Sequence, residues 1–432
     1  MTTTHTRYFP NRSAAARKGF GVFMILGIIL MVGIVAIVLL TGWLSYHRQQ
    51  LQTGGDAAAL AAAARLMDPW VLDPAATGPS VDPARIEAAK QTALDYLMAN
   101  RAYGSDESLD AGFVLNAANT PGGGTLVGHI DYKPGLNAPF VPWNPEAAQT
   151  DAANASPTAS PDEDDIVNAI AIRNVRSEKQ SNAVSSWFAQ MFLKPYGETQ
   201  AESVAILQQN IDGFRPVRLV GENFSNIPMA PIAVKLPNDN PLLDWRSPEI
   251  DIELESVEDT PQSRLTGSRI VFPGENTNDD TLFFTRLKSG IAPADLAQMN
   301  GEIRLADVLT TEPLDIAAQS DQWSALDDSL YAQVRIWPIV LPAEDSSDDA
   351  STDTPTDVAT DFGTATDAAT TNTGSSGQSQ IIGFVAGRIV GLESTGSTIV
   401  VKVRPELLQT STGIITPTAK PNPWIGKVHL VW

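Results

Sequence analysis

Acidic side chains are the residues whose types and spacing come closest to a reactive or metal-binding site in this chain. Residues 162–165 form a run of carboxylates that could chelate Ca²⁺, but the central glycine of an EF-hand loop is missing. Glu253 and Glu255, spaced by two, would lie on one face of a strand. The run is more typical of an exposed acidic loop, and the glutamate pair of a solvated strand face, than of an acid/base site.

Other reactive residue types are scarce. The absence of cysteine excludes disulfides, thiol catalysis and thiolate metal sites, and the four histidines are too scattered to form a clustered zinc site. Residues 123–129 (GGTLVGH) have the glycines of a phosphate-binding loop, but His129 stands where such a loop needs lysine. We therefore expect no catalytic residue, no cofactor and no metal site, and we predict that the protein is not an enzyme.

The charge balance limits the classes of partner. The 432 residues include 50 acidic and 29 basic side chains, which gives a net charge of −21. Nucleic acids and anionic membrane surfaces both require a positive patch, so neither is expected as the main partner of the soluble part. Hydrophobic residues make up 43 % of the chain, enough for a sizeable core.

An apolar segment near the N-terminus predicts a membrane anchor. Residues 20–44 carry no charge, and about 20 helical residues already cross the hydrocarbon core of a bilayer. Trp43 and Tyr46 stand where an interfacial aromatic belt belongs. Four basic and no acidic residues precede the segment, so the positive-inside rule places residues 1–19 in the cytoplasm and the residues after Leu44 outside. A cleaved signal peptide is the alternative, but its apolar region is shorter, 7–15 residues.

Residues 45–67 predict an Ala-rich helix that continues the span. Small and apolar residues recur on one face at helical spacing: Leu51, Gly55, Ala58, Ala62 and Leu66. Such a face permits the close approach of a second helix. It could therefore contact a partner helix, or it could pack against the protein's own folded region. Pro69 and Pro74 would end the helix.

The segment GGDAAALAAAARL (residues 54–66), placed directly after an apolar span and a glutamine-containing turn, resembles the N-terminal segment of TadE/TadG-like proteins of the tight-adherence (Flp pilus) system. The matching positions are Gln50, Gln52, Asp56, Ala57, Ala58, Leu60 and Ala61. Downstream segments resemble the family loosely. The metal-binding Asp-x-Ser-x-Ser triplet of the von Willebrand A domain found in many TadG-like proteins is absent, and so is a pilin processing motif.

The remaining chain predicts an α+β fold. Residues 86–100 have the pattern of an amphipathic helix, and several short apolar segments, among them 249–257, 269–272, 282–287 and 330–341, have that of strands. A short helix is expected at 292–299. Residues 343–380 hold eight acidic and no basic side chains and predict a disordered linker between an α+β region at 68–342 and a C-terminal β segment at 381–432.

The resemblance implies a single-pass protein of the bacterial cytoplasmic membrane that acts by binding and scaffolding in Flp pilus assembly, with other pilus-assembly membrane proteins as its partners. The same layout would suit a membrane-tethered adhesion or sensor domain unrelated to pili. A membrane-tethered hydrolase that uses carboxylates is the third possibility. No nucleic acid and no small-molecule substrate is expected.

Overall fold

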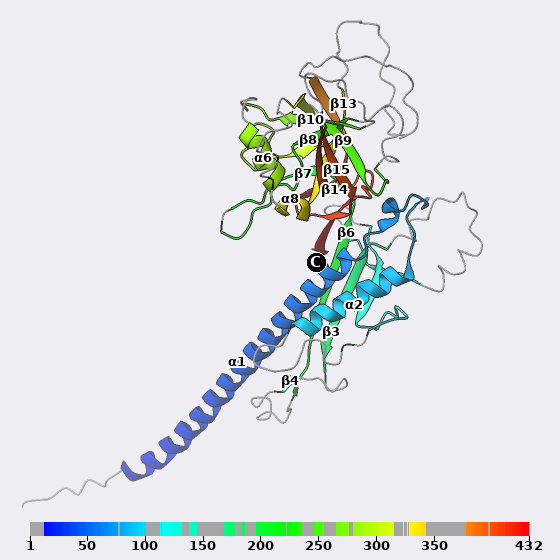
Figure 1. Ribbon diagram of the computed structural model, residues 1–432. Helices are drawn as coiled ribbons and strands as arrows, with labels where there is room; N and C mark the ends of the chain where they lie inside the picture. Colours follow the sequence, from blue (N-terminus) through cyan, green and yellow to red (C-terminus); the bar gives the residue numbers. More distant parts are fainter. Residues whose placement is uncertain are drawn as a thin grey trace, which may run out of the picture. The chain divides into compact units, whose positions relative to one another are not determined.

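The computed structural model describes most of the chain (Figure 1). The described residues are 13–76, 78–100, 113, 115–131, 138–144, 167–177, 184–185, 196–221, 223–235, 245–254, 265–275, 280–314, 323, 326, 328–342, 377–395 and 398–431. The acidic run at 162–165 and residues 343–376 of the expected linker lie outside them.

The N-terminal helix α1 runs without a break through Ser13–Ala64, and so joins the expected span to the Ala-rich segment. It ends three residues before the expected boundary at residue 67. A short 3-10 helix, η1 (Pro69–Leu72), follows. The expected amphipathic helix is present as α2 (Pro83–Ala99), where the side chain of Asp82 accepts a 2.9 Å hydrogen bond from Ala84 N and caps the first turn.

The chain divides into two compact units. Unit 1 comprises residues 1–59, 90–126 and 171–204, and unit 2 comprises residues 60–89, 127–170 and 205–432. The six-stranded sheet has the order β16-β18-β6-β3-β1-β2. Its strands are β1 (Thr125–His129), β2 (Val141–Pro142), β3 (Ala169–Arg176), β6 (Thr199–Gln208), β16 (Leu408–Gln409) and β18 (Ile425–Val431). The strands β4 (Val184–Ser185) and β5 (Tyr196–Gly197) pair separately in unit 1.

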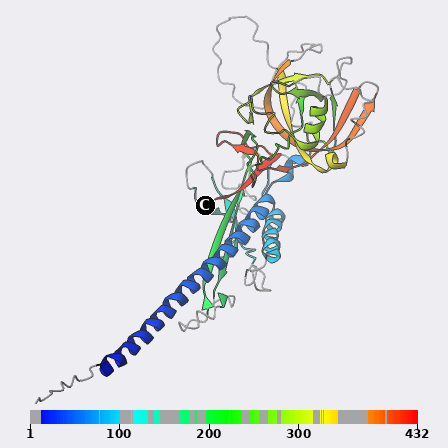
Figure 2. The ribbon, with the colours of Figure 1, turned by 90° about the vertical axis from the view of Figure 1, so that its left-hand side faces the viewer.

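Unit 2 contains a seven-stranded sheet of order β12-β10-β8-β13-β14-β15-β9. Its strands are β8 (Ile232–Lys235), β9 (Ile250–Leu254), β10 (Thr266–Val271), β12 (Val308–Glu312), β13 (Val334–Pro342), β14 (Gly377–Thr395) and β15 (Thr398–Pro405). Two further pairings, β12 with β14 and β10 with β9, close this sheet on itself, and its strands curve into a barrel (Figure 2). A small sheet of β11 (Ile303–Arg304), β7 (Ile211–Phe214) and β17 (Gly413–Ile415) belongs to the same unit.

Two tryptophans occupy the core of unit 2. Trp245 and Trp337 are buried with ring centroids 6.3 Å apart. Each indole N–H donates a 3.1 Å hydrogen bond to β14, from Trp245 to Ala386 O and from Trp337 to Gly387 O. The N–H group of each ring therefore has a hydrogen-bond acceptor, although both rings lie in an apolar core.

Residues 282–287 were expected as a strand and are helical, within α6 (Asp280–Ser289). Phe283, Phe284 and Leu287 are buried at a spacing that only a helix places on one face. An acidic first turn and a basic last turn also suit the helix dipole. The expected short helix at 292–299 consists of successive turns instead. Residues 328–332, near the start of an expected strand, form the helix α8 (Asp328–Ala332).

The expected boundary of the acidic linker at residue 380 is also wrong. β14 begins at Gly377, which pairs with Thr311 of β12, so the last four linker residues are strand. The residues after the linker do not form a separate segment either, because residues 379–388 of β14 pair with β13, on the other side of the linker. The acidic stretch is thus an insertion between two neighbouring strands of one sheet.

Candidate functional site

The N-terminal half of α1 has the length and composition of a membrane-spanning helix. It is the one such helix among the described residues, and its most apolar stretch of 18 residues is only 6 % buried. A helix in the core of a soluble protein would be mostly buried, whereas this one exposes large apolar side chains along its length. The helix fits a membrane anchor, as the sequence predicted.

Aromatic and polar residues follow the apolar stretch on α1. The rings of Trp43 and His47 meet edge to face with centroids 4.5 Å apart, and Gln50 donates a 3.1 Å hydrogen bond to the hydroxyl of Tyr46. Trp43 and Tyr46 are exposed. Amphipathic rings in this position are typical of the boundary between hydrocarbon and headgroups.

One turn further along α1, a polar contact joins the helix to strand β6 within unit 1. The side-chain amide nitrogen of Gln52 lies 2.8 Å from Asp56 Oδ1, 3.1 Å from Ser203 Oγ and 3.1 Å from the carbonyl oxygen of Glu202. Gln52 and Asp56 are four residues apart and therefore neighbours on the helix surface. Both are positions at which the sequence resembles the TadE/TadG-like segment. Gln52 contacts the strand directly, and Asp56 contacts Gln52.

Gly55 allows this close approach. A Cβ atom on Gly55 would come 2.7 Å from Ser203 Oγ, closer than such atoms normally approach. Ala58 and Ala59, one turn further on, are fully buried. Since small side chains let the backbones of packed elements come together, the glycine and alanines of the motif suit a helix packed on a strand.

The structure places the expected contact face of α1 inside the chain. Its five residues are all buried: Leu51, Gly55, Ala58, Ala62 and Leu66. Of the other motif residues, Asp56 accepts from Gln52, while Ala57, Leu60 and Ala61 are half-buried. A face that is already covered is not open to a partner helix, and this favours the second interpretation of the stripe, packing against the protein's own folded region.

Ser203 and Glu202 were not predicted as members of this site. One signal could have identified Ser203: Ala201, Ser203 and Ala205 alternate along β6, and all three are buried. A strand with small inward residues is the natural counterpart of a helix with a small-residue stripe. Nothing in the sequence pairs Glu202 with Arg173, whose Nε lies 3.0 Å from Glu202 Oε1.

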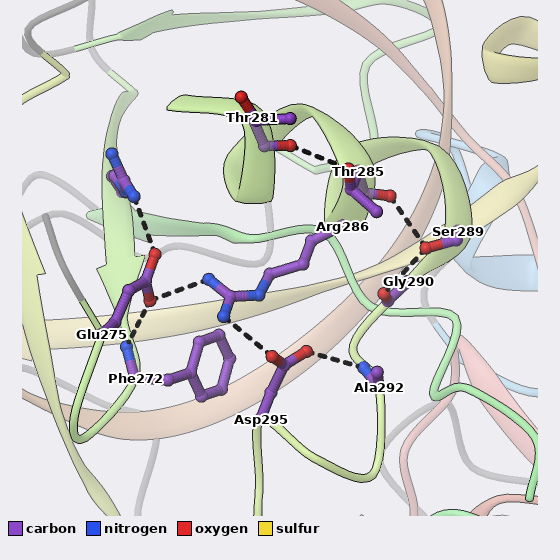
Figure 3. Close-up of polar contacts among 10 residues, drawn as sticks. Phe272, Glu275, Thr281, Thr285, Arg286, Ser289, Gly290, Ala292 and Asp295 are labelled. Atoms are coloured by element: carbon purple, nitrogen blue, oxygen red, sulfur yellow. Dashed lines mark hydrogen bonds and ion pairs between the residues drawn. The ribbon is translucent and has the colours of Figure 1, made fainter. Parts of the chain in front are cut away.

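Unit 2 contains a buried ion-pair network that the sequence did not predict (Figure 3). Glu275 lies 2.7 Å from Arg269 Nη2 and 2.7 Å from Arg286 Nη1, and Arg286 Nη2 lies 2.8 Å from Asp295. The backbone N–H of Phe272 donates to Glu275 at 2.9 Å, and that of Ala292 donates to Asp295 at 2.8 Å. The guanidinium of Arg286 also stacks 4.6 Å from the ring centroid of Phe272.

The charges in this network stabilise one another. Burial alone would raise the pKa of Glu275, but the hydrogen bonds from Phe272 N, Arg269 and Arg286 outweigh burial and lower its pKa. Burial likewise opposes the charge of Arg286, but its bonds to Asp295 and Glu275 raise its pKa. A carboxylate held ionised between two arginines is a poor proton acceptor at neutral pH. The network therefore has the properties of a structural link between α6 and the turns on either side of it.

No metal site is found in the described part of the chain. No three acidic or histidine side chains lie close enough there to bind a metal ion. Unit 2 holds a cavity of about 350 Å³ between Trp245, Phe384 and Trp424, with a mostly apolar lining. The expectation of a solvated strand face for the glutamate pair is wrong for Glu253, which is buried in β9, while Glu255 lies outside the described residues.

Taken together, α1 and the strand-rich region define a protein with one N-terminal apolar helix that fits a membrane anchor and a folded α+β region after it. Residues 19–65 match the family model of TadE/G-like Flp pilus-assembly proteins (Tad), and the match coincides with α1. The chain thus carries a TadE/G-like segment at its N-terminal helix. No curated protein and no solved structure matches the chain significantly.

Proposed function

We propose that this protein is a membrane-anchored scaffold of the Tad (Flp pilus-assembly) system, which acts by binding other assembly components rather than by catalysis. The match of residues 19–65 to the TadE/G-like family carries the proposal, because that segment is both the anchor and the junction with the folded region. The family supports a role in the Tad system. Binding and scaffolding are our inference.

The geometry of the junction supports a scaffolding role. The apolar stretch and the Gln52–Asp56 contact belong to one unbroken helix, so the span and the strand β6 are linked without an intervening loop. A continuous helix is stiffer than a flexible linker of the same length, so its two ends stay at a more constant separation. The helix would therefore hold strand β6 of unit 1 at a fixed distance from the membrane.

The partner surface is expected on the folded region or on the lipid-exposed face of the span. The small-residue face of α1 is buried and is not proposed as a partner contact. Other Tad membrane proteins are the proposed partners. An adhesion or sensor domain unrelated to pili is the alternative, and it would leave pilus assembly intact when the gene is deleted.

The proposed location is the cytoplasmic membrane, with residues 1–19 inside and the folded region outside. Cysteine can be introduced singly at Ser13 or at the exposed Ser80 of this cysteine-free chain. In cells with a permeabilised outer membrane, an impermeant maleimide should label Ser80→Cys and leave Ser13→Cys unlabelled. The reverse pattern would overturn the orientation.

Deletion of the gene tests the function itself. We expect surface Flp pili, counted by electron microscopy, to be lost and then restored by the full chain. A second complementing chain, with residues 19–65 replaced by an unrelated single-pass anchor, should restore few pili or none. Normal piliation of the deletion strain would refute a role in assembly and favour the adhesion or sensor alternative.

A further inference from the structure

A short hairpin of unit 2 exposes three large apolar side chains. It comprises residues 217–221 and 223–225, and an isolated β-bridge and a 2.7 Å backbone hydrogen bond hold its two arms together. Val220, at the tip, is fully exposed, while Leu219 and Phe224 are 51 % and 53 % exposed. Large apolar side chains that lie together in solvent, rather than scattered singly, mark an interaction surface.

The cavity of about 350 Å³ in the same unit has the chemistry to receive such side chains. The buried rings of Trp245, Phe384 and Trp424 line it, and most of its lining is apolar. Its volume falls within the range of about 300–1,000 Å³ that is usual for ligand pockets. Gly383 of β14 also lines it, and a Cβ atom on this glycine would point into open space, with nothing within 4 Å.

Two irregularities of the backbone shape the wall of this cavity. The pairing of β14 with β13 shifts between Ile381 and Gly383, so Ile382 is a bulged residue, and it lines the cavity. Leu305, also in the lining, precedes Ala306, whose φ of 69° is unfavourable for a residue with a side chain. The N–H of Ala306 donates a 2.8 Å hydrogen bond to Ile381 O, which fixes this conformation. Bulges and strained residues of this kind concentrate at binding sites, where they direct side chains.

The hairpin does not occupy the cavity of its own chain. Ile211 and Asp212, at the start of β7, line the cavity, whereas the hairpin follows the other end of this strand at Phe214. The tip residue Val220 lies in solvent. A second copy of the chain supplies both an apolar tip and an apolar cavity, and anchoring of all copies in one membrane would raise their effective concentration.

We propose that the hairpin tip of one copy, Leu219 and Val220, inserts into the aromatic cavity of a second copy. The two surfaces differ, so the interface is heterologous, and each added copy presents a free hairpin or a free cavity to the next. Repetition of the contact produces a ring or an open chain of copies. Such an array would present many identical surfaces in a row. Self-association of this kind does not depend on a role in pilus assembly.

Light scattering of the full-length protein in detergent, over a series of concentrations, tests the contact from both sides. Val220→Asp should weaken self-association about ten-fold or more, because it places a charge at the centre of an apolar interface. Gly383→Leu should weaken it as strongly by filling the cavity. Gly78→Leu is the matched control, since Gly78 also has open space around it but does not line the cavity. All three variants should keep the thermal midpoint of the wild type.

Mixing the variants tests the head-to-tail arrangement. The Val220→Asp protein keeps its cavity and the Gly383→Leu protein keeps its hairpin, so an equimolar mixture should form pairs but no longer assemblies. Cysteine cross-linking gives a second readout, because the chain contains no cysteine. Oxidation of a variant with both Val220→Cys and Thr418→Cys should give a ladder of linked copies, since Thr418 is an exposed residue of the cavity lining. Each single cysteine variant should remain unlinked.

Four results would overturn the proposal. The first is a wild type that stays monomeric throughout the concentration series. The second is unchanged association of Val220→Asp or of Gly383→Leu, and the third is a mixture of the two variants that forms no pairs. The fourth is a loss of other co-purified membrane proteins on Val220→Asp while self-association is unchanged, which would show that the tip binds a different partner.

Discussion

Gly55 of α1 and Ser203 of β6 are so close together that the methyl group of an alanine at position 55 would clash with the serine hydroxyl. A Cβ atom on Gly55 would lie 2.7 Å from Ser203 Oγ, and the same oxygen lies 3.1 Å from the amide nitrogen of Gln52. The hydroxyl therefore cannot yield to a larger residue without weakening the bond to Gln52. This one contact links the family motif to the folded region.

The Gly55–Ser203 contact predicts non-additive effects on stability. Alanine is favoured over glycine inside a helix by about 1 kcal/mol. In the wild type this gain should be cancelled by the clash of Gly55→Ala with Ser203 Oγ. In a Ser203→Ala background the clash is gone, and Gly55→Ala should stabilise the protein by about 1 kcal/mol. Denaturant unfolding of the full chain in detergent gives the unfolding free energy of the wild type, of each single variant and of the double variant.

A larger side chain serves as a second test of the same contact. Gly55→Leu should destabilise by about 1–3 kcal/mol, the usual range for overpacking. Thr53→Leu, at an exposed position of the same helix, is the control and should have little effect. The account would be contradicted if the effects of Gly55→Ala and Ser203→Ala on the unfolding free energy were additive and the two leucine variants were equally stable. These results would show that α1 does not pack closely on β6.

The ion-pair network predicts a pH dependence. Because the pKa of Glu275 is lower in the folded state than in the unfolded state, its contribution to stability is present above the unfolded pKa. That contribution is lost as the pH falls through the lower, folded pKa. The unfolding free energy should therefore decrease as the pH falls below about 4.3, where an ordinary glutamate is half protonated.

Glu275→Gln tests this contribution directly. At neutral pH the substitution should cost about 3–5 kcal/mol, because it leaves Arg269 and Arg286 buried without their shared anion. The unfolding free energy of the variant should also decrease less at acid pH than that of the wild type. Glu393→Gln, which removes an exposed carboxylate 2.6 Å from Lys402, is the control and should change little. Equal effects of the two variants would mean that the buried network contributes nothing specific.

The insertion between β13 and β14 predicts a tolerated deletion. Pro342 pairs with Ser379, so the two strands are adjacent where the acidic stretch leaves and re-enters the sheet. Replacement of residues 344–376 by a short Asn-Gly-containing turn should leave the thermal midpoint within a few degrees. Extending the deletion to residue 380 also removes the partners of β12 and should lower the midpoint clearly. Equal midpoints for both deletions would contradict the pairing of β12 with β14.

Local patterns predicted the helices of the N-terminal region well. An uncharged run of sufficient length specifies α1, and the burial of Ile86, Ala89, Ala93 and Leu97 in α2 follows the helical spacing of the sequence. The same kind of reasoning failed at α6. There, Phe283 and Phe284 are adjacent aromatic residues, which favour strands in isolation, and their packing in the core decides the outcome.

Contacts between residues far apart in the chain could not be predicted from the sequence. The pairing of Gly377 with Thr311 joins residues on opposite sides of the acidic stretch, and no local pattern marks it. The Glu275–Arg286 pair likewise depends on how a turn and a helix meet. For α1, the sequence identified a stripe of small residues, and in the structure these residues are buried. Only the position of Ser203 identified the strand that covers it.

Co-purification from membranes tests the central claim most directly. The tagged full-length protein and an unrelated single-pass protein at equal abundance would be cross-linked in cells, solubilised in detergent and analysed by quantitative mass spectrometry. Our account predicts that membrane components of Flp pilus assembly are enriched with the full chain over the unrelated protein. An intact, membrane-inserted protein that recovers none of these components above the control would contradict the proposed role in pilus assembly.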